Sequence, residues 1–408
     1  MGDLSVWLAG KKVATLSQKR RRMSLVYTND AGPLGSPLIS LAMPVASVRY
    51  GDREARAFFH GLLPEGNAGR IIAYDLGLAP NDDFGLLAAL GKDCAGALVI
   101  QPADEKDPRE VTPGAVEVLS SQEIESRLAG LETFPLGVGK RVRVSLAGQQ
   151  SKLLLARLPD GQWALPVGGS VSTHIIKPPH ARFRDTVANE AFCMTLAAQA
   201  GIESAKTSVV EFSGMEVLVS ERFDRYLRHD GQVERIHQED ACQALSVLTA
   251  PSERKYQENG GPSLLQIARI LDQWAGSSAK QSLLRAVAFN VFVGNADAHG
   301  KNFSFLHHAD GSIGLAPLYD IMSTVALEGS ISTTLAMFVN DRRDIDNVDV
   351  ADLVAEAGRW GMAAVAARDV IEDLLVSLPS AIEKTSSLLS PPERLVDVIS
   401  GRVARART

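Results

Sequence analysis

The chain has few cysteines, no long apolar run and no large excess of one charge. Only three cysteines occur among 408 residues, and Cys94, Cys193 and Cys242 lie too far apart for the CxxC spacing of metal or redox sites. No apolar run approaches the roughly 18 to 20 residues that span a bilayer, and residues 1–12 lack the apolar core of a signal peptide. We therefore expect a cytoplasmic protein with reduced thiols and no membrane segment.

The composition excludes a polybasic nucleic-acid binder and extended disorder. Lysine and arginine (42) against aspartate and glutamate (48) give a net charge of −6, and apolar residues make up 45% of the chain. At roughly 100 to 200 residues per domain, this length suits two to four domains. These numbers indicate a multidomain globular protein and leave its function open.

The order of predicted elements divides the chain into four segments. Residues 1–105 mix short strands and amphipathic helices, which predicts a small α+β module, and the polar, proline-containing residues 106–140 predict a connector. Residues 141–236 contain predicted strands around one helix, and residues 237–408 are mostly helical. We predict an α+β fold in which a cleft separates a strand-rich N-lobe from a helical C-lobe.

A predicted hairpin within residues 294–320 is the most informative feature. Its two strands flank the Asp-Gly turn at 310–311, so Asn302 and Asp320 should arrive at the same open end. Asp297 precedes Asn302 by five positions. Although each residue alone is an ordinary turn residue, amide and carboxylate oxygens together suit Mg²⁺.

The spacing Asp-x4-Asn, followed by a hairpin and another Asp, is that of the protein-kinase catalytic loop and metal site. Upstream, a glycine-containing loop at 145–152 could lay backbone N–H groups over phosphates, and Lys177 ends a predicted strand. Glu190, on the next helix, could pair with Lys177, and residues 221–224 occupy a linker whose backbone could read an adenine edge. Each signal alone has a plain alternative, such as a hairpin turn or a solvated side chain, but their order favours a kinase.

These residues resemble the HipA family of bacterial serine/threonine kinases, the toxin half of the HipBA toxin–antitoxin systems. The resemblance covers essentially the whole chain, with landmarks SLAGQQSK at 145–152, STHIIKP at 172–178, SERFDR at 220–225, GNADAHGKNFS at 294–304 and LAPLYDIMS at 315–323. It implies a two-lobed protein-kinase-like fold with the extra N-terminal module packed on the N-lobe.

The resemblance also implies site residues. Asp297 would be the catalytic base, and Asn302 and Asp320 would hold Mg²⁺. Ser145 matches a serine that is autophosphorylated in the family, where a dianionic phosphate would repel the phosphates of ATP and silence the enzyme. Ser151 stands where the family commonly has glutamate, which makes the dynamics of this loop less predictable. The implied ATP-binding residues are Ala147, Gly148, Gln149, Gln150, Ser151, Lys152, Lys177, Glu221, Arg222, Phe223, His299, Gly300, Lys301 and Tyr319.

As partners, the resemblance implies a HipB-like helix-turn-helix antitoxin and operator DNA, reached mainly through that antitoxin. The implied substrate is a translation protein such as an aminoacyl-tRNA synthetase, with glutamyl-tRNA synthetase the leading candidate, and its phosphorylation would arrest growth and promote persistence. Two alternatives stay open. A small-molecule phosphotransferase shares the Asp, Asn and Asp pattern but lacks the N-terminal module, and a non-catalytic co-repressor would not need Asp297.

Overall fold

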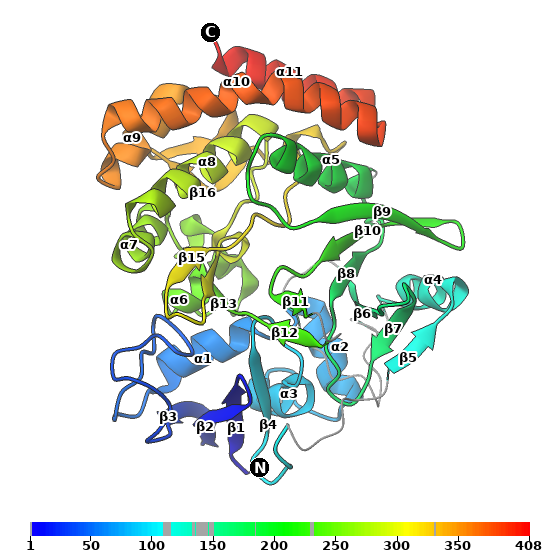
Figure 1. Cartoon of the computed structure of the whole chain (residues 1–408), viewed down its shortest axis with the longest axis vertical. Coiled ribbons are helices and arrows are strands. Elements are labelled where there is room, and N and C mark those ends of the chain that lie inside the picture. The colour runs from blue at the N-terminus through cyan, green and yellow to red at the C-terminus, as the bar shows by residue number, and fades with distance from the viewer. Residues whose placement is uncertain are drawn as a thin grey trace.

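The computed structural model describes residues 2–108, 116–132, 135, 146, 151–183, 185–228, 232–329 and 332–408. The N-terminal module (residues 2–105) lies at one end of the long axis, and helices α10 (Ala364–Leu389) and α11 (Glu393–Ala406) lie at the other (Figure 1). The described parts of residues 116–236 form the N-lobe, and residues 237–408 form the C-lobe. Ser145 and residues 147–150 lie outside the described residues.

A four-stranded antiparallel sheet in the order β3-β2-β1-β4 forms the base of the N-terminal module. Met23, Leu25 and Tyr27 alternate as the buried residues of β3, as expected for a strand with one face on a core. The elements are β1 (Leu4–Leu8), β2 (Lys11–Lys19), β3 (Arg22–Tyr27), α1 (Asp52–Gly61), α2 (Gly66–Asp75), α3 (Asp83–Leu90) and β4 (Leu98–Pro102).

The N-lobe is a six-stranded antiparallel sheet in the order β5-β7-β6-β8-β10-β9. Leu153, Leu154 and Leu155 follow one another in β6 and are all fully buried, so both faces of this central strand are covered. The elements are β5 (Val116–Leu119), α4 (Ser121–Ala129), β6 (Leu153–Arg157), β7 (Trp163–Pro166), β8 (His174–Lys177), α5 (Thr186–Gln199), β9 (Thr207–Phe212) and β10 (Met215–Glu221).

The predicted connector at 106–140 differs from the structure, because it contributes β5 and α4 to the N-lobe. Ser120 Oγ accepts from Glu123 N at 3.3 Å, and the Glu123 carboxylate accepts from Ser120 N at 2.8 Å. This capping box begins α4. The polar composition concealed β5 because an edge strand exposes most of its residues, as β5 does.

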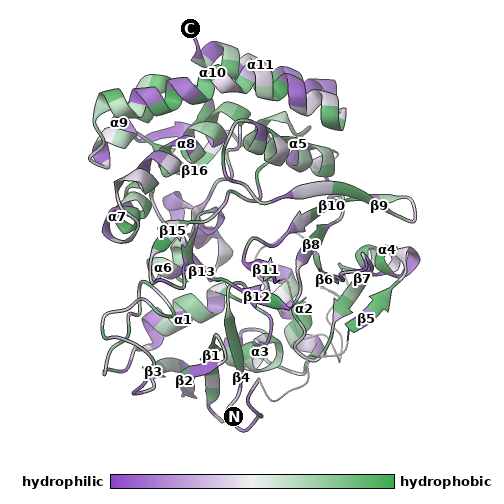
Figure 2. Ribbon diagram, in the orientation of Figure 1, coloured by the Kyte–Doolittle hydropathy of each residue, from purple (hydrophilic) through white to green (hydrophobic). Residues whose placement is uncertain are grey.

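The C-lobe carries the predicted hairpin within a three-stranded sheet, ordered β13-β14-β15. Helices α10 and α11 alternate apolar and polar surfaces along their length (Figure 2), the pattern of amphipathic helices that cover a core. No helix in the described ranges is long and apolar enough to span a membrane. The remaining elements are β11 (Arg225–Leu227), β12 (Val233–Arg235), β13 (His237–Asp240), α6 (Ala241–Ala244), α7 (Leu264–Trp274), α8 (Ser277–Val293), β14 (Ser304–His307), β15 (Ile313–Leu315), β16 (Thr334–Val339), β17 (Arg342–Asp344) and α9 (Val350–Arg359), with 3-10 turns η1 (Ser252–Lys255), η2 (Gln257–Asn259), η3 (Gly300–Asn302), η4 (Thr324–Ala326) and η5 (Ile345–Asn347).

Two hydrophobic cores divide the molecule differently from the lobes. One core joins the N-terminal module to the N-lobe sheet, through residues such as Phe58 and Leu154. The other fills the C-lobe and includes Phe192 and Leu196 of α5. Helix α5 therefore follows β8 in the chain but packs with the C-lobe, next to α10 (Figure 1).

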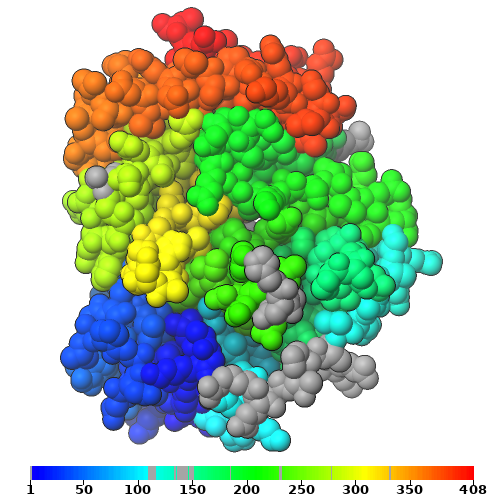
Figure 3. All heavy atoms as spheres, in the orientation of Figure 1, coloured from blue at the N-terminus to red at the C-terminus, as the bar shows by residue number. Residues whose placement is uncertain are grey.

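The N-terminal module also docks on the C-lobe, next to the segment around residues 300–320 (Figure 3). The buried Glu239 carboxylate accepts hydrogen bonds from Ser40 Oγ at 2.6 Å and from Leu41 N at 2.7 Å. His237 contacts Ile39 O through Nε2 at 2.8 Å and Ala97 N through Nδ1 at 3.4 Å. Because Ala97 N–H needs an acceptor, Nδ1 stays unprotonated and Nε2 carries the hydrogen.

We expect this histidine to make docking sensitive to acid. Burial and the neighbouring His307 lower the pKa of His237 from 6.5 to about 3. The folded state thus binds fewer protons than the unfolded state. The contribution of His237 to the free energy of unfolding is therefore complete above pH 6.5 and is lost as the pH falls toward 3. Over that window the unfolding free energy should fall by up to about 1.4 kcal/mol per pH unit from this group.

Thermal unfolding of wild type and His237→Gln between about pH 4 and pH 7 measures this contribution. The wild-type melting temperature should fall more steeply with acid than that of His237→Gln, while His308→Gln, at an exposed position, should follow wild type. Parallel pH profiles for wild type and His237→Gln would contradict the assignment.

Candidate active site

A cavity of about 840 Å³ lies between the lobes and gathers most of the predicted site residues. Its walls come from the N-lobe sheet, the linker after β10, the hairpin region of the C-lobe and the N-terminal module. The predicted residues that line it are Lys152, Lys177, Glu221, Arg222, Phe223, Asp297, His299, Lys301, Asn302, Tyr319 and Asp320.

Lys177 is the central cation of the cavity. It is the last residue of β8, whose pairing with β10 sets Lys177 opposite Leu218. Its Nζ donates to Glu190 Oε1 at 2.6 Å and also contacts Asp320 Oδ1. Burial disfavours its charge, but Asp320 and Glu190 outweigh burial and raise the pKa of Lys177. The ammonium is therefore charged and fixed in position, which is what binding of phosphate requires.

Lys152 adds a second buried cation beside Lys177. Burial and the charge of Lys177 lower the pKa of Lys152 to about 8. Two ammonium groups close enough to interact concentrate positive charge at this end of the cavity. Such a site favours an anionic ligand that carries several charges, such as a polyphosphate.

Asn302 and Asp320 meet at the open end of the hairpin, as predicted. Asn302 Nδ2 lies 3.2 Å from Asp320 Oδ2, and Asn302 Oδ1 accepts from His299 N at 3.2 Å. Asp320 has a left-handed backbone (φ 59°), a conformation that stores strain and is concentrated at functional sites. Burial alone would raise the pKa of Asp320, but Lys177 lowers it below its usual range. The Asp320 carboxylate and the Asn302 amide, whose oxygen here accepts from His299 N, together supply the oxygen types that fit Mg²⁺.

Asp297 opens into the cavity near this pair. The Tyr256 hydroxyl donates to Asp297 Oδ1 at 2.9 Å and leaves Oδ2 of the carboxylate available. Desolvation within the cavity raises the pKa of Asp297, although the positive charge of Lys255 opposes the change. An oriented carboxylate with a raised pKa is suited to accept a proton from a hydroxyl group.

An aromatic pair and the hinge, which we define as residues 221–225, form another part of the cavity wall. The ring of Phe223 lies 5.3 Å from the ring of Tyr319. The hinge N–H groups of Glu221 and Arg222 already donate to backbone oxygens, at 2.8 and 2.9 Å. Reading of an adenine edge would therefore depend on the other backbone groups of the hinge.

Two predicted ATP-binding residues differ from their expected placement. Lys301 borders the cavity, but its Nζ is bound to Asp240 at 2.9 Å, and Glu65 of the N-terminal module lies 3.5 Å away. Gly300 faces Pro262 and Cys242 and does not line the cavity. These residues form the 3-10 turn η3 with Asn302. Successive side chains in such a turn point about 120° apart, so the side chain of Lys301 does not point in the same direction as that of Asn302.

Of the predicted phosphate loop, Ser151 is exposed and does not line the cavity. Ala147, Gly148, Gln149 and Gln150 lie outside the described residues, as does the predicted autophosphorylation residue Ser145. Their roles stay predictions.

Sequence reasoning missed Lys255 and Tyr256, which both line the cavity. Lys255 is only 6% exposed, and its Nζ lies 5.4 Å from the ring centroid of Tyr256. Among the described residues, no carboxylate lies within 4.0 Å of that ammonium. Lys255 ends η1, and Tyr256 follows it before the next turn. No strand or helix periodicity marks this segment, so its signal in the sequence is the motif KYQENGGPS at 255–263.

Comparison with known proteins identifies relatives along the whole chain. Residues 144–382 match the family model of the HipA-like C-terminal domain, and residues 4–101 match that of the HipA N-terminal domain. The protein named "Putative kinase Y4mE" from Sinorhizobium fredii is 40% identical over 99% of this chain and 98% of its own length. The serine/threonine-protein kinase toxin HipA of Shewanella oneidensis is 29% identical over 90% of this chain and 84% of its own.

A solved structure extends the similarity to three dimensions. The Shewanella oneidensis toxin–antitoxin complex of HipA, HipB and operator DNA contains a chain that superposes with a TM-score of 0.83 at 27% identity. The alignment covers 99% of this chain and 95% of that one. The predicted kinase-like α+β fold is confirmed by this match.

Proposed function

Because this chain belongs to the HipA family, we propose that it is a protein serine/threonine kinase that uses ATP and Mg²⁺ and acts as the toxin of a toxin–antitoxin pair. One arrangement carries the proposal. Lys177, held by Glu190, faces the same cavity as Asp297, Asn302 and Asp320. Protein kinases use these residue types, in this chain order, to bind phosphates, accept a proton and hold metal.

The geometry supports the following roles in transfer. Lys177 binds the nucleotide phosphates, and Tyr256 orients the carboxylate of Asp297. Asp297 accepts the hydroxyl proton of the substrate as the hydroxyl oxygen bonds to the γ-phosphorus, and the bond from that phosphorus to the bridging oxygen breaks to release ADP. Mg²⁺, when bound by Asn302 and Asp320, neutralises charge on the phosphates.

The partners follow from the family. We propose a HipB-like antitoxin and contact with operator DNA mainly through it, supported by the similarity to the HipA chain of the HipA, HipB and DNA complex. We further propose a translation protein as the substrate, with glutamyl-tRNA synthetase the first to test. Self-inactivation would occur by phosphorylation of Ser145.

Incubation of the purified protein with radiolabelled ATP and Mg²⁺, alone and with a bacterial lysate, tests the proposal. Label should enter a serine or threonine of this chain or of a lysate protein, and mass spectrometry should identify the residue. Label in a small molecule only would support the phosphotransferase alternative, and no transfer with intact operator binding would support the co-repressor.

We expect Lys255 to act on the transferred phosphoryl group. Lys255 is buried and interacts electrostatically with Asp297, but among the described residues no carboxylate lies within 4.0 Å of its ammonium, so it can also interact with an anion in the cavity. Lys255→Met should lower kcat by about 100-fold while the dissociation constant for ATP changes by less than about threefold. Steady-state phosphoryl-transfer assays measure kcat, and calorimetric titration with nucleotide measures the dissociation constant for ATP.

Lys280→Met is the matched control. Lys280 is also buried, at 8% exposed, but its Nζ is bound to Asp272 and to Trp360 O away from the cavity. Lys280→Met should lower the free energy of unfolding and leave kcat unchanged. If Lys255→Met and Lys280→Met lowered kcat equally, Lys255 would have no special role in transfer.

A further inference from the structure

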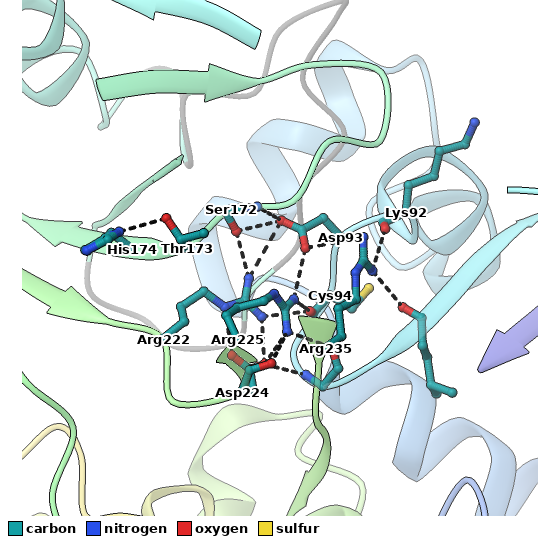
Figure 4. Close-up of polar contacts among 12 residues, drawn as sticks. Lys92, Asp93, Cys94, Ser172, Thr173, His174, Arg222, Asp224, Arg225 and Arg235 are labelled. Carbon is teal, nitrogen blue, oxygen red and sulfur yellow. Dashed lines mark hydrogen bonds and ion pairs between the residues drawn. The ribbon is translucent and has the colours of Figure 1, made fainter. Parts of the chain in front are cut away.

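A buried ionic network joins the N-terminal module to two walls of the cavity (Figure 4). It centres on the 92–97 loop, which connects α3 to β4. Asp93 of this loop is fully buried, as is Arg222 of the hinge, and both lie among groups that are nearly as buried. The charged members are Asp93, Arg222, Asp224, Arg225 and Arg235.

The first connection runs from the loop to the hinge. Asp93 Oδ1 lies 3.0 Å from Arg225 Nη2, and Asp93 Oδ2 lies 3.7 Å from Arg222 Nη1. Cys94 O accepts from both arginines, at 2.9 and 2.8 Å, and Gly96 N donates to Asp224 Oδ2 at 2.7 Å. The side chains of Arg222, Asp224 and Arg225 are thus held by the loop, and the hinge residues 221–224 line the cavity.

The 92–97 loop packs closely against β13 at Gly96. Gly96 has a positive φ of 76°, and a Cβ at this position would lie 2.8 Å from His237 Nδ1 and 2.9 Å from Gln238 N. Only glycine fits this geometry without a shift of the neighbouring strand. Ala95, one residue earlier, itself lines the cavity.

The second connection runs from the same aspartate to the strand of Lys177. Asp93 Oδ2 accepts from Ser172 N at 2.9 Å and from Ser172 Oγ at 2.6 Å. Ser172 lies just before β8, which ends at Lys177. Thr173 O then accepts from Arg222 N at 2.9 Å, so the start of β8 and the hinge are also bound to each other.

The charges of the network explain why Asp93 is central. Three guanidinium groups share two carboxylates, and burial together with the charge of Arg222 lowers the pKa of Arg225 to about 10. Loss of the Asp93 carboxylate would leave the three arginines with Asp224 alone. Their repulsion would act directly on the hinge, because two of them belong to it.

We propose that Asp93 is a positioning residue for nucleotide binding, through which the N-terminal module fixes both the hinge and the strand that carries Lys177. The proposal rests on the proposed function, since it assigns the nucleotide to this cavity. Asp93 touches no ligand; it acts through Arg222 and Ser172. The N-terminal module is in this view a part of the nucleotide site.

Asp93→Asn in the full-length protein tests the proposal, because it removes the charge and keeps the shape. The dissociation constant and the KM for ATP should both rise about tenfold, while kcat at saturating ATP should stay within about threefold of wild type. Ser172→Ala, which leaves every charge in place, should raise the KM less and provides a milder variant if Asp93→Asn does not fold.

Asp83→Asn is the matched control. Asp83 is a buried carboxylate of the same module and binds Arg56 at 3.0 Å, but it does not line the cavity. It should lower the melting temperature and keep the wild-type dissociation constant for ATP. A lower melting temperature with unchanged ATP affinity in Asp93→Asn and Ser172→Ala would overturn the proposal. Wild-type protein that binds no ATP would instead overturn the proposed function.

Discussion

Replacement of Asp297 by asparagine should lower the rate of phosphoryl transfer by about 10³-fold and leave ATP binding intact. The amide can still accept the hydrogen bond from the Tyr256 hydroxyl, so the side chain keeps its orientation. It cannot accept the proton of the substrate hydroxyl, and the metal and phosphate groups are untouched. Single-turnover transfer to the labelled substrate, together with nucleotide titration, separates the two effects.

Glu258→Gln is the control for this change. Glu258 also lines the cavity and is exposed, with its carboxylate 3.6 Å from Arg343. It should transfer phosphate at a rate within about threefold of wild type. If Asp297→Asn retained more than about a tenth of the wild-type rate, the assignment of Asp297 as the base would fail.

Replacement of Asp320 by alanine should remove the dependence of ATP affinity on Mg²⁺ and lower transfer by about 10³-fold. The change deletes the carboxylate that lies beside Asn302 and that also contacts Lys177. ATP affinity measured over a series of Mg²⁺ concentrations should tighten with metal for wild type and stay flat for Asp320→Ala.

Glu190→Gln provides the contrast. It weakens the other partner of Lys177 at 2.6 Å but leaves Asn302 and Asp320 in place. Its ATP affinity should be lower than that of wild type and should still respond to Mg²⁺. Equal ATP affinity and equal Mg²⁺ response in wild type and Asp320→Ala would exclude the assigned metal role.

The sequence predicted the proximity of Asn302 and Asp320 because their relation is local. A hairpin with a defined turn places Asn302 and Asp320 together whatever the rest of the chain does, and the structure has them 3.2 Å apart. Lys177 and Glu190 are separated by only 13 residues, and their pairing follows from a strand and the helix after it. Local spacing thus accounts for most of the site.

The parts that could not be predicted depend on contacts between distant segments. Asp93 meets Ser172 and Arg225 across 79 and 132 positions, and no periodic pattern links them. The family resemblance implies an ATP-binding role for Lys301, but in the structure its Nζ is bound to Asp240. Such outcomes are set by tertiary packing, which neither composition nor periodicity records.

The division of the molecule into two cores separates Lys177 from the residues that bind it. Lys177 is carried by the sheet that shares its core with the N-terminal module, whereas Glu190 and Asp320 belong to segments of the other core, where Asn189 and Ser323 are bonded to each other at 2.8 and 3.0 Å. A relative movement of the two cores would therefore change the contacts of Lys177 with Glu190 and with Asp320 together. The contacts of Lys177 with Glu190 and Asp320 therefore depend on how the two cores are placed relative to each other.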